Sequence, residues 1–152
     1  MKILLTGGAG FIGSNFILNY IDNNQILNYD KLTYAGNLDN LNSVSNHSNY
    51  SFIKGDIKDI NKINEALNLF NPDAIINFAA ESHVDRSIDG PRSFIETNIL
   101  GTFELLNCSF KYYQNLDISK KENFKFLHIS TDEVYGSLGN NSKFKETNSY
   151  KP

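Results

Sequence analysis

Two adjacent carboxyl groups, Asp132 and Glu133, are the side chains of this sequence best suited to acid–base chemistry. They follow Thr131 directly and come just after an apolar run, residues 124–129, that predicts a buried strand. In open α/β sheets the ligand crevice lies outside the carboxyl ends of the strands. Residues 130–136 are therefore the predicted reaction centre, and the alternative is a solvated strand end in which Asp132 only caps a helix.

A cofactor site is predicted near the N-terminus by three glycines, Gly7, Gly10 and Gly13. They follow a short apolar strand at residues 2–6 and precede apolar residues at helical spacing that begin at Phe11. The first glycine permits a tight turn, the second lets the backbone approach a pyrophosphate, and the third lets the helix pack on the strand. The N–H groups at the helix start then face the anion. An ordinary glycine-rich turn is the alternative, but the position between strand and helix favours dinucleotide binding.

Asp30 ends the second predicted strand, near the position where dinucleotide-binding domains carry an acid that hydrogen-bonds the adenosine ribose. A carboxylate there repels the 2′-phosphate of NADP, so NAD is the predicted cofactor, although the neighbouring Lys31 works against this preference. The alternative is that Asp30 caps a turn or helix. Asp56, which closes the third predicted strand, is equally compatible with a helix cap and with a cofactor contact.

The remaining pattern alternates between strands and helices. Strands are predicted at residues 26–30, 50–55, 74–80 and 124–129, helices at 59–70 and 93–113, and a long polar loop at 32–51 with a short helix around 38–44. Because crossovers between parallel strands are right-handed, we expect a doubly wound, Rossmann-like α/β fold with strand order 3-2-1-4-5. A single NAD-binding domain over residues 1–152 is expected.

Several residues receive structural rather than chemical interpretations. An apolar stripe on the helix at 93–113 is expected to be core, His128 to be a hydrogen-bonded interior residue, and Cys108 to be a buried thiol. His83 follows the strand at 74–80, where a substrate contact and a solvated side chain are equally compatible with the sequence. No cluster of Cys and His has metal-ligand spacing, so no metal is expected. The apolar stripe on the helix at 93–113 comprises Ile95, Ile99, Phe103, Leu106 and Phe110.

Composition excludes some functional classes. The 152 residues carry a formal charge of −3 with both signs interspersed, so nothing points to nucleic acid or to a membrane surface. One cysteine excludes an internal disulfide framework and fits a reducing compartment, so a cytoplasmic protein is expected. The sequence ends in a turn-like Tyr150-Lys151-Pro152, and we expect it to be an N-terminal fragment whose C-terminal part is missing.

The segments Thr6–Gly13 and Ser130–Gly136 together resemble the extended short-chain dehydrogenase/reductase family, and within it the nucleotide-sugar 4,6-dehydratases. Three further segments, residues 30–38, 79–87 and 94–98, carry the same likeness, so the resemblance covers the whole chain. The glycines identify only the superfamily, whereas the adjacent Asp132 and Glu133 discriminate within it. The resemblance implies an NAD-dependent lyase of deoxysugar and cell-surface polysaccharide biosynthesis that acts on dTDP-glucose, and a homodimer at full length.

The resemblance also assigns roles. It implies transient hydride transfer from C4 of the sugar to tightly bound NAD, and Glu133 as the base for the C5 proton. Asp132 would protonate the departing C6 hydroxyl and Thr131 would hydrogen-bond the sugar near C4. The implied substrate contacts are Ser82, His83 and Thr131. The implied cofactor contacts are Gly7, Gly10, Phe11, Ile12, Gly13, Asp30, Lys31, Leu32, Thr33, Asp56, Ile57, Phe78, Ala79, Ala80, Glu81, Ser82 and Thr97.

One feature of the family is expected outside the chain. Its Tyr-x-x-x-Lys pair, which takes the C4 hydroxyl proton and holds the ribose, is expected beyond Pro152. Five tyrosines lack a lysine four positions on, and Tyr150 is too near the end; the five are Tyr20, Tyr34, Tyr112, Tyr113 and Tyr135. We therefore expect residues 1–152 alone to be inactive.

Two alternatives remain open at this stage. A nucleotide-sugar 4-epimerase or decarboxylase could use the same scaffold, but an epimerase has no use for an acid–base pair after Thr131. A non-catalytic NAD-binding module is the alternative from a different class of protein, and the intact Thr131-Asp132-Glu133 argues against it.

Overall fold

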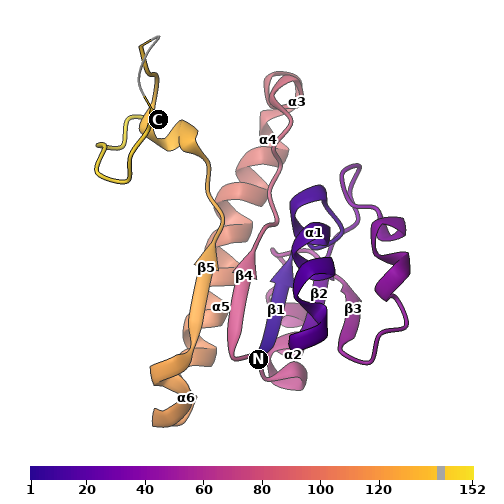
Figure 1. The fold of residues 1–152 in the computed structure, drawn as a ribbon. Coiled ribbons are helices and arrows are strands. Elements are labelled where there is room, and N and C mark those ends of the chain that lie inside the picture. The colour runs from indigo at the N-terminus through magenta and orange to yellow at the C-terminus, as the bar shows by residue number, and fades with distance from the viewer. Residues whose placement is uncertain (140–142) are drawn as a thin grey trace.

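A computed structural model describes residues 1–139 and 143–152 (Figure 1). Five parallel strands form one sheet in the order β3-β2-β1-β4-β5, which confirms the predicted topology. The strands are β1 (Lys2–Thr6), β2 (Gln25–Asp30), β3 (Tyr50–Lys54), β4 (Ala74–Asn77) and β5 (Lys125–His128). Because all five are parallel, their carboxyl ends share one edge of the sheet, the upper edge in Figure 1.

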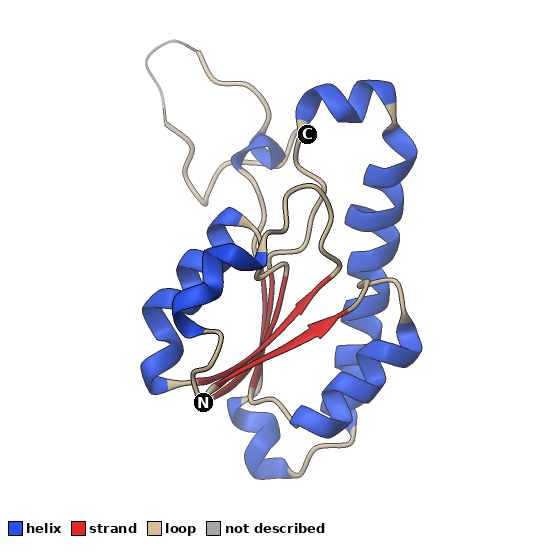
Figure 2. Ribbon diagram, turned by 90° about the vertical axis from the view of Figure 1, so that its right-hand side faces the viewer, coloured by secondary structure: helices blue, strands red, loops and turns tan. Residues whose placement is uncertain are grey.

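Helices cover both faces of the sheet (Figure 2). On one face, α1 (Phe11–Tyr20) and a 3₁₀ helix at Leu38–Val44 bury residues such as Ile17 and Leu41 against β1 and β2. On the other face, α2 (Ile60–Phe70) and α5 (Thr102–Gln114) bury residues such as Leu67 and Leu105. Side chains of β1, β2 and β4 alternate between the two cores, as expected of strands that are covered on both faces.

The helix predicted at 93–113 is divided in the structure. It begins as α4 (Pro91–Phe94), continues as a π-helical segment at Ile95–Gly101, and regains α-helical geometry in α5. Two short α-helices were not predicted: α3 (Val84–Asp89), which follows the strand predicted at 74–80, and α6 (Ile118–Asn123), which precedes the strand predicted at 124–129. Strand β4 ends at Asn77 although the apolar run continues to Ala80, because the chain leaves the sheet there.

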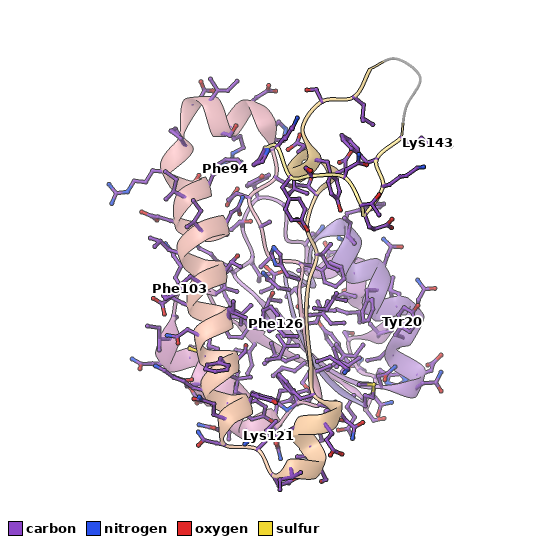
Figure 3. All side chains as sticks on the ribbon, turned by 90° about the vertical axis from the view of Figure 1, so that its left-hand side faces the viewer. Tyr20, Phe94, Phe103, Lys121, Phe126 and Lys143 are labelled. Carbon is purple, nitrogen blue, oxygen red and sulfur yellow. The ribbon has the colours of Figure 1, made fainter. Side chains whose placement is uncertain are left out.

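The prediction that the apolar stripe forms core is wrong. Phe103 is 59% exposed and points away from the sheet in Figure 3, and the other four stripe residues are exposed as well. The helix packs instead through a face that includes Gly101, Leu105 and Cys108. A Cβ on Gly101 would lie 2.7 Å from the Ile57 side chain, so the small residue lets the helix approach the sheet closely. Cys108 is buried as predicted, and burial raises the pKa of its thiol.

His128 departs from its prediction in one respect. Its ring nitrogen Nδ1 lies 3.0 Å from Asn77 Nδ2, so it is hydrogen-bonded, but the side chain is exposed rather than interior. The reason is topological, since β5 is an edge strand of this sheet. In the described part of the chain, no helix has the length and apolar character needed to cross a membrane.

Candidate active site

The glycine turn has the geometry that the sequence predicted. Gly7 adopts φ +73°, a conformation that favours glycine, and a Cβ there would lie 2.6 Å from the backbone nitrogen of Ala79. A Cβ on Gly13 would overlap the carbonyl of Gly7, so α1 can cross the turn only with glycine at this position. The turn therefore brings the end of β1, the start of α1 and the segment after β4 into contact.

The start of α1 is open to an anion. Phe11 and Ile12 are 82% and 61% exposed, and no described residue accepts a hydrogen bond from their backbone N–H groups. Unpaired first-turn N–H groups and the positive end of the helix dipole bind phosphate well. Around Gly10 a Cβ would meet only the Gly7 carbonyl, at 3.4 Å, so space is left for a ligand. These features fit a pyrophosphate at this position.

Asp30 organises the backbone around the same turn. Its buried carboxylate accepts hydrogen bonds from Ala9 N–H at 2.9 Å and from Leu32 N–H at 2.7 Å. It therefore acts as a turn cap, one of its two predicted roles, and the remaining lone pairs of its oxygens could still accept a ribose hydroxyl. Leu32 adopts φ +57°, which is uncommon for a residue with a branched side chain and costs about 1–3 kcal/mol. Thr33 follows it in the same loop.

Asp56 does not cap a helix N-terminus, since Asp59 caps α2 by accepting from Lys62 N–H. Asp56 instead accepts from Lys58 N–H at 3.0 Å and pairs with the Lys31 ammonium at 2.8 Å. Burial raises the pKa of Asp56, but the hydrogen bonds from Lys31 and Lys58 outweigh it, and the pKa lies below its ordinary value. Ile57 is buried against α5.

A buried polar network lies under the carboxyl edge of the sheet. Thr6 Oγ1 donates to Asn77 Oδ1 at 2.5 Å, and the same oxygen accepts from Ala79 N–H at 3.2 Å. Asn77 Nδ2 in turn approaches His128 Nδ1. The ends of β1, β4 and β5 are thus linked through one amide, and the segment from Phe78 onward starts from a fixed position. Phe78 itself packs its ring against Phe16 of α1, with centroids 5.7 Å apart.

The segment after β4 is held by two hydrogen bonds from the side chain of Asn98. Asn98 Oδ1 accepts from Glu81 N–H and its Nδ2 donates to the Glu81 carbonyl, both at 2.8 Å. Asn98 lies in the π-helical segment next to Thr97, one of the predicted cofactor contacts. Such π-helical turns are frequent at functional sites. The sequence did not predict this contact, because Asn98 and Glu81 are 17 residues apart and belong to different elements.

Two loops meet across the end of β1. The Arg86 guanidinium of α3 lies 3.8 Å from the centroid of the Tyr34 ring, and the His83 ring approaches Tyr34 edge-on at 6.5 Å. The loop after β2 and the segment after β4 are thereby joined beside the glycine turn. Ser82 and Ala80 are exposed in this segment.

The predicted reaction centre lies past the end of β5, beyond the same edge of the sheet. Thr131 Oγ1 accepts from Glu133 N–H at 3.3 Å and caps a short 3₁₀ helix at Asp132–Tyr135, so the cap is Thr131 rather than Asp132. All three side chains of the triplet are exposed. The Tyr135 ring stacks on that of Tyr150 and contacts that of Phe144 at a tilt, with both centroid distances 5.5 Å.

A Tyr-x-x-x-Lys spacing also occurs within the chain, at Tyr50 and Lys54, although the family's own pair is expected beyond Pro152. Tyr50 and Lys54 stand at the two ends of β3, about 13 Å apart along the strand. The Tyr50 hydroxyl hydrogen-bonds Asn28 Nδ2 at 3.0 Å, and burial raises its pKa despite that bond. An activated tyrosine needs a lowered pKa and a position at the carboxyl edge, so this pair does not take the family role.

The structure thus brings several predicted cofactor residues together around the end of β1. Contacts around the end of β1 join the glycine turn to Asp30 and to Ala79, and a ring contact joins Tyr34 to His83. Lys31 and Asp56 form a second group at the ends of β2 and β3. Thr131, Asp132 and Glu133 stand apart from both groups. Within residues 1–139 and 143–152, no three His, Cys, Asp or Glu side chains are grouped as metal ligands.

A parallel sheet of order 3-2-1-4-5 with a glycine turn after its first strand defines a Rossmann-like α/β protein. The model of the GDP-mannose 4,6 dehydratase family matches residues 4–152, and the chain belongs to that family. It is 52% identical, over 153 aligned residues, to a protein of Sinorhizobium fredii described as a probable dTDP-glucose 4,6-dehydratase. That alignment includes 100% of the chain and 44% of the relative.

Solved structures extend the comparison. The dTDP-glucose 4,6-dehydratase DesIV of Streptomyces venezuelae, crystallised with NAD and TYD, superposes with a TM-score of 0.84 at 41% identity, covering 100% of this chain and 46% of DesIV. A UDP-glucose 4-epimerase of Thermus thermophilus in complex with NAD gives a TM-score of 0.83 at 27% identity, covering 100% of this chain and 45% of that one. The chain therefore spans less than half the length of these relatives.

Proposed function

We propose that the chain is the NAD-binding part of a dTDP-glucose 4,6-dehydratase, a lyase of cytoplasmic deoxysugar biosynthesis. The observation that carries the proposal is the adjacency of Asp132 and Glu133 after Thr131, at the end of β5 and on the sheet edge that also carries the glycine turn. An epimerase shares the fold but has no step that needs two carboxyl groups there. The Sinorhizobium and Streptomyces relatives, both described as dTDP-glucose 4,6-dehydratases, support the same choice.

The described residues fit NAD at the glycine turn. The unpaired N–H groups of Phe11 and Ile12 would bind the pyrophosphate, and Asp30 would accept from the adenosine ribose. The adenine would lie near Asp56 and Ile57, and the nicotinamide near residues 78–82 and Thr97. Bound NAD would supply a hydride acceptor for C4 of the sugar and, in its reduced form, a hydride donor for C6.

The side chains after β5 would perform the dehydration. Once C4 is a ketone the C5 proton is acidic, and Glu133 would remove it through a carboxylate oxygen. Asp132 would start protonated and give its proton to the departing C6 hydroxyl, so water leaves. Two carboxyl groups with different surroundings can hold these opposite protonation states. Thr131 Oγ1 would hydrogen-bond the sugar near C4, with Ser82 and His83 as further substrate contacts.

A homodimer is part of this proposal. The stripe along the π-helical segment and α5 exposes five large apolar side chains, a concentration that marks an interaction surface. A second copy of the chain would cover this stripe through the same residues, as in most symmetric dimers. The substrate-binding part would lie in the additional length that the relatives possess, with residues 1–152 as the NAD-binding domain.

The function is tested on the full-length gene product and on residues 1–152. The full-length protein is expected to convert dTDP-glucose to a 4-keto-6-deoxy sugar, detected by its absorbance in alkali, and Glu133→Gln is expected to lose at least a hundredfold in rate. Residues 1–152 are expected to bind NAD without turnover. An epimerised product would overturn the proposal in favour of the epimerase, and NAD binding without any turnover by the full-length protein would favour a non-catalytic module.

A further inference from the structure

The ion pair between Lys31 and Asp56 joins the ends of two neighbouring strands. Lys31 follows β2 and Asp56 follows β3, and the Nζ–Oδ2 distance is 2.8 Å. The lysine side chain is 50% exposed and the aspartate side chain 25%. Asp56 is held in place from its other oxygen by Lys58 N–H. The carboxylate therefore has a backbone partner as well, whereas the described part of the chain shows no second hydrogen bond or ion pair for the Lys31 ammonium.

The charge of Lys31 matters because of what lies beside it. Dinucleotide-binding domains place the adenosine ribose at the carboxyl end of the second strand, and a cationic side chain there accommodates the 2′-phosphate of NADP. Asp30 carries a negative charge at this point and cannot turn away, since both its oxygens accept backbone N–H groups. An unpaired ammonium on Lys31 would partly neutralise the charge of Asp30. The ion pair with Asp56 directs the Lys31 charge to Asp56 instead.

A further lysine that follows β3, Lys58, is paired as well. The Lys58 ammonium lies 2.9 Å from Glu96, which also receives the Arg92 guanidinium at 2.8 Å. Release of Lys31 from Asp56 would therefore add one cation to the edge of the ribose site without freeing Lys58. With all three charges present, Asp30, Lys31 and Asp56 sum to one negative charge.

We propose that Asp56 acts as a specificity determinant, which excludes 2′-phosphorylated dinucleotides by holding the Lys31 ammonium away from the ribose of NAD. This role rests on the proposed NAD-binding function. It adds to that function a residue other than Asp30 and the glycines of the turn. It assigns opposite effects to the two partners. Removing the charge of Asp56 improves binding of NADP relative to NAD, whereas removing the charge of Lys31 makes the discrimination stronger.

The test measures dissociation constants for NAD and NADP on residues 1–152 by calorimetry at low ionic strength. Asp56→Asn keeps an oxygen for Lys58 N–H and loses the charge, so the ratio of the NADP constant to the NAD constant is expected to fall about tenfold. Lys31→Gln is expected to raise this ratio. The double variant is expected to lose the gain in NADP binding. Asp59→Asn, which removes a nearby carboxylate that caps α2, is the matched control and is expected to leave the ratio unchanged.

The outcomes separate the two proposals. If the parent chain binds NAD and Asp56→Asn leaves the ratio unchanged, the specificity role is wrong and the proposed function stands. If the double variant keeps the improved NADP binding, Lys31 is not the group released and the role is again wrong. If the folded parent chain binds neither dinucleotide, the proposed function fails and the specificity role fails with it. Circular dichroism of each variant establishes that it is folded.

Discussion

The side chain of Asn98 makes two hydrogen bonds to the backbone of Glu81, at 2.8 Å each, so that the amide of Asn98 pairs with Glu81 as a neighbouring strand would. Glu81 lies four residues past the end of β4, where the sheet ladder no longer holds the chain. The contact spans from the π-helical segment to the segment proposed to face the nicotinamide. It holds a segment that has few other backbone hydrogen bonds of its own.

Asn98→Ala is expected to loosen this loop without unfolding the domain. Each hydrogen bond contributes about 0.5–1.5 kcal/mol, so amide exchange at Glu81 should accelerate by roughly tenfold or more and NAD should bind more weakly. Hydrogen exchange with mass spectrometry and calorimetry measure the two effects. Asn115→Ala, which removes a side-chain bond to Lys111 at the far end of α5, is the control. Unchanged exchange at Glu81 would show that the loop is held by other contacts.

The strands and their order could be predicted because the signals are local. Short apolar runs such as residues 2–6 and 74–80 are bounded by glycine, proline or aspartate, and the alternation with helices leaves few topologies open. Gly7, Gly13 and Asp30 were found for the same reason, since their spacing follows from the turn they build. In these cases one segment of sequence contains the whole physical constraint.

The orientation of α5 could not be predicted from hydrophobicity. Both Phe103 and Leu105 are apolar, yet the first is exposed and the second is fully buried. The packed face includes the close approach of Gly101 to Ile57, a contact between residues far apart in the sequence. The same limit explains why the Lys31–Asp56 pair and the Asn98–Glu81 contact were missed, because both depend on where two distant segments meet.

Substitutions on the two faces of α5 are expected to separate assembly from stability. Leu105→Ala should lower the free energy of unfolding by about 2–5 kcal/mol, since it opens a cavity in the core. Phe103→Ser should change it by about 0.5 kcal/mol or less, because the ring is exposed in the single chain. If the stripe pairs two copies, Phe103→Ser should also weaken self-association in sedimentation experiments. A loss of stability in monomeric Phe103→Ser comparable to that of Leu105→Ala would contradict the observed packing.

Glu96 gives a pH-dependent prediction. Hydrogen bonds from Arg92 and then from Lys58 lower the pKa of its carboxyl from 4.5 to about 2. Because the folded pKa lies below the ordinary value, the ion pairs add stability above pH 4.5, and this contribution is lost as the pH falls toward about 2. The melting temperature of Glu96→Gln should therefore lie below that of the parent chain at pH 7, and the difference should shrink across this interval.

The comparison needs a carboxyl of the same kind outside the ion pairs. Glu122→Gln on the exposed α6 serves this purpose and should leave the melting temperature unchanged at each pH. Direct titration of the Glu96 carboxyl carbon by NMR provides a second readout that does not depend on unfolding, with an expected midpoint of about 2. A midpoint near 4.5, or a melting difference that stays constant down to pH 2, would mean that Lys58 and Arg92 do not hold Glu96 in solution. The segment after β3, which carries Lys58, would then contact the π-helical segment, which carries Glu96, through packing alone.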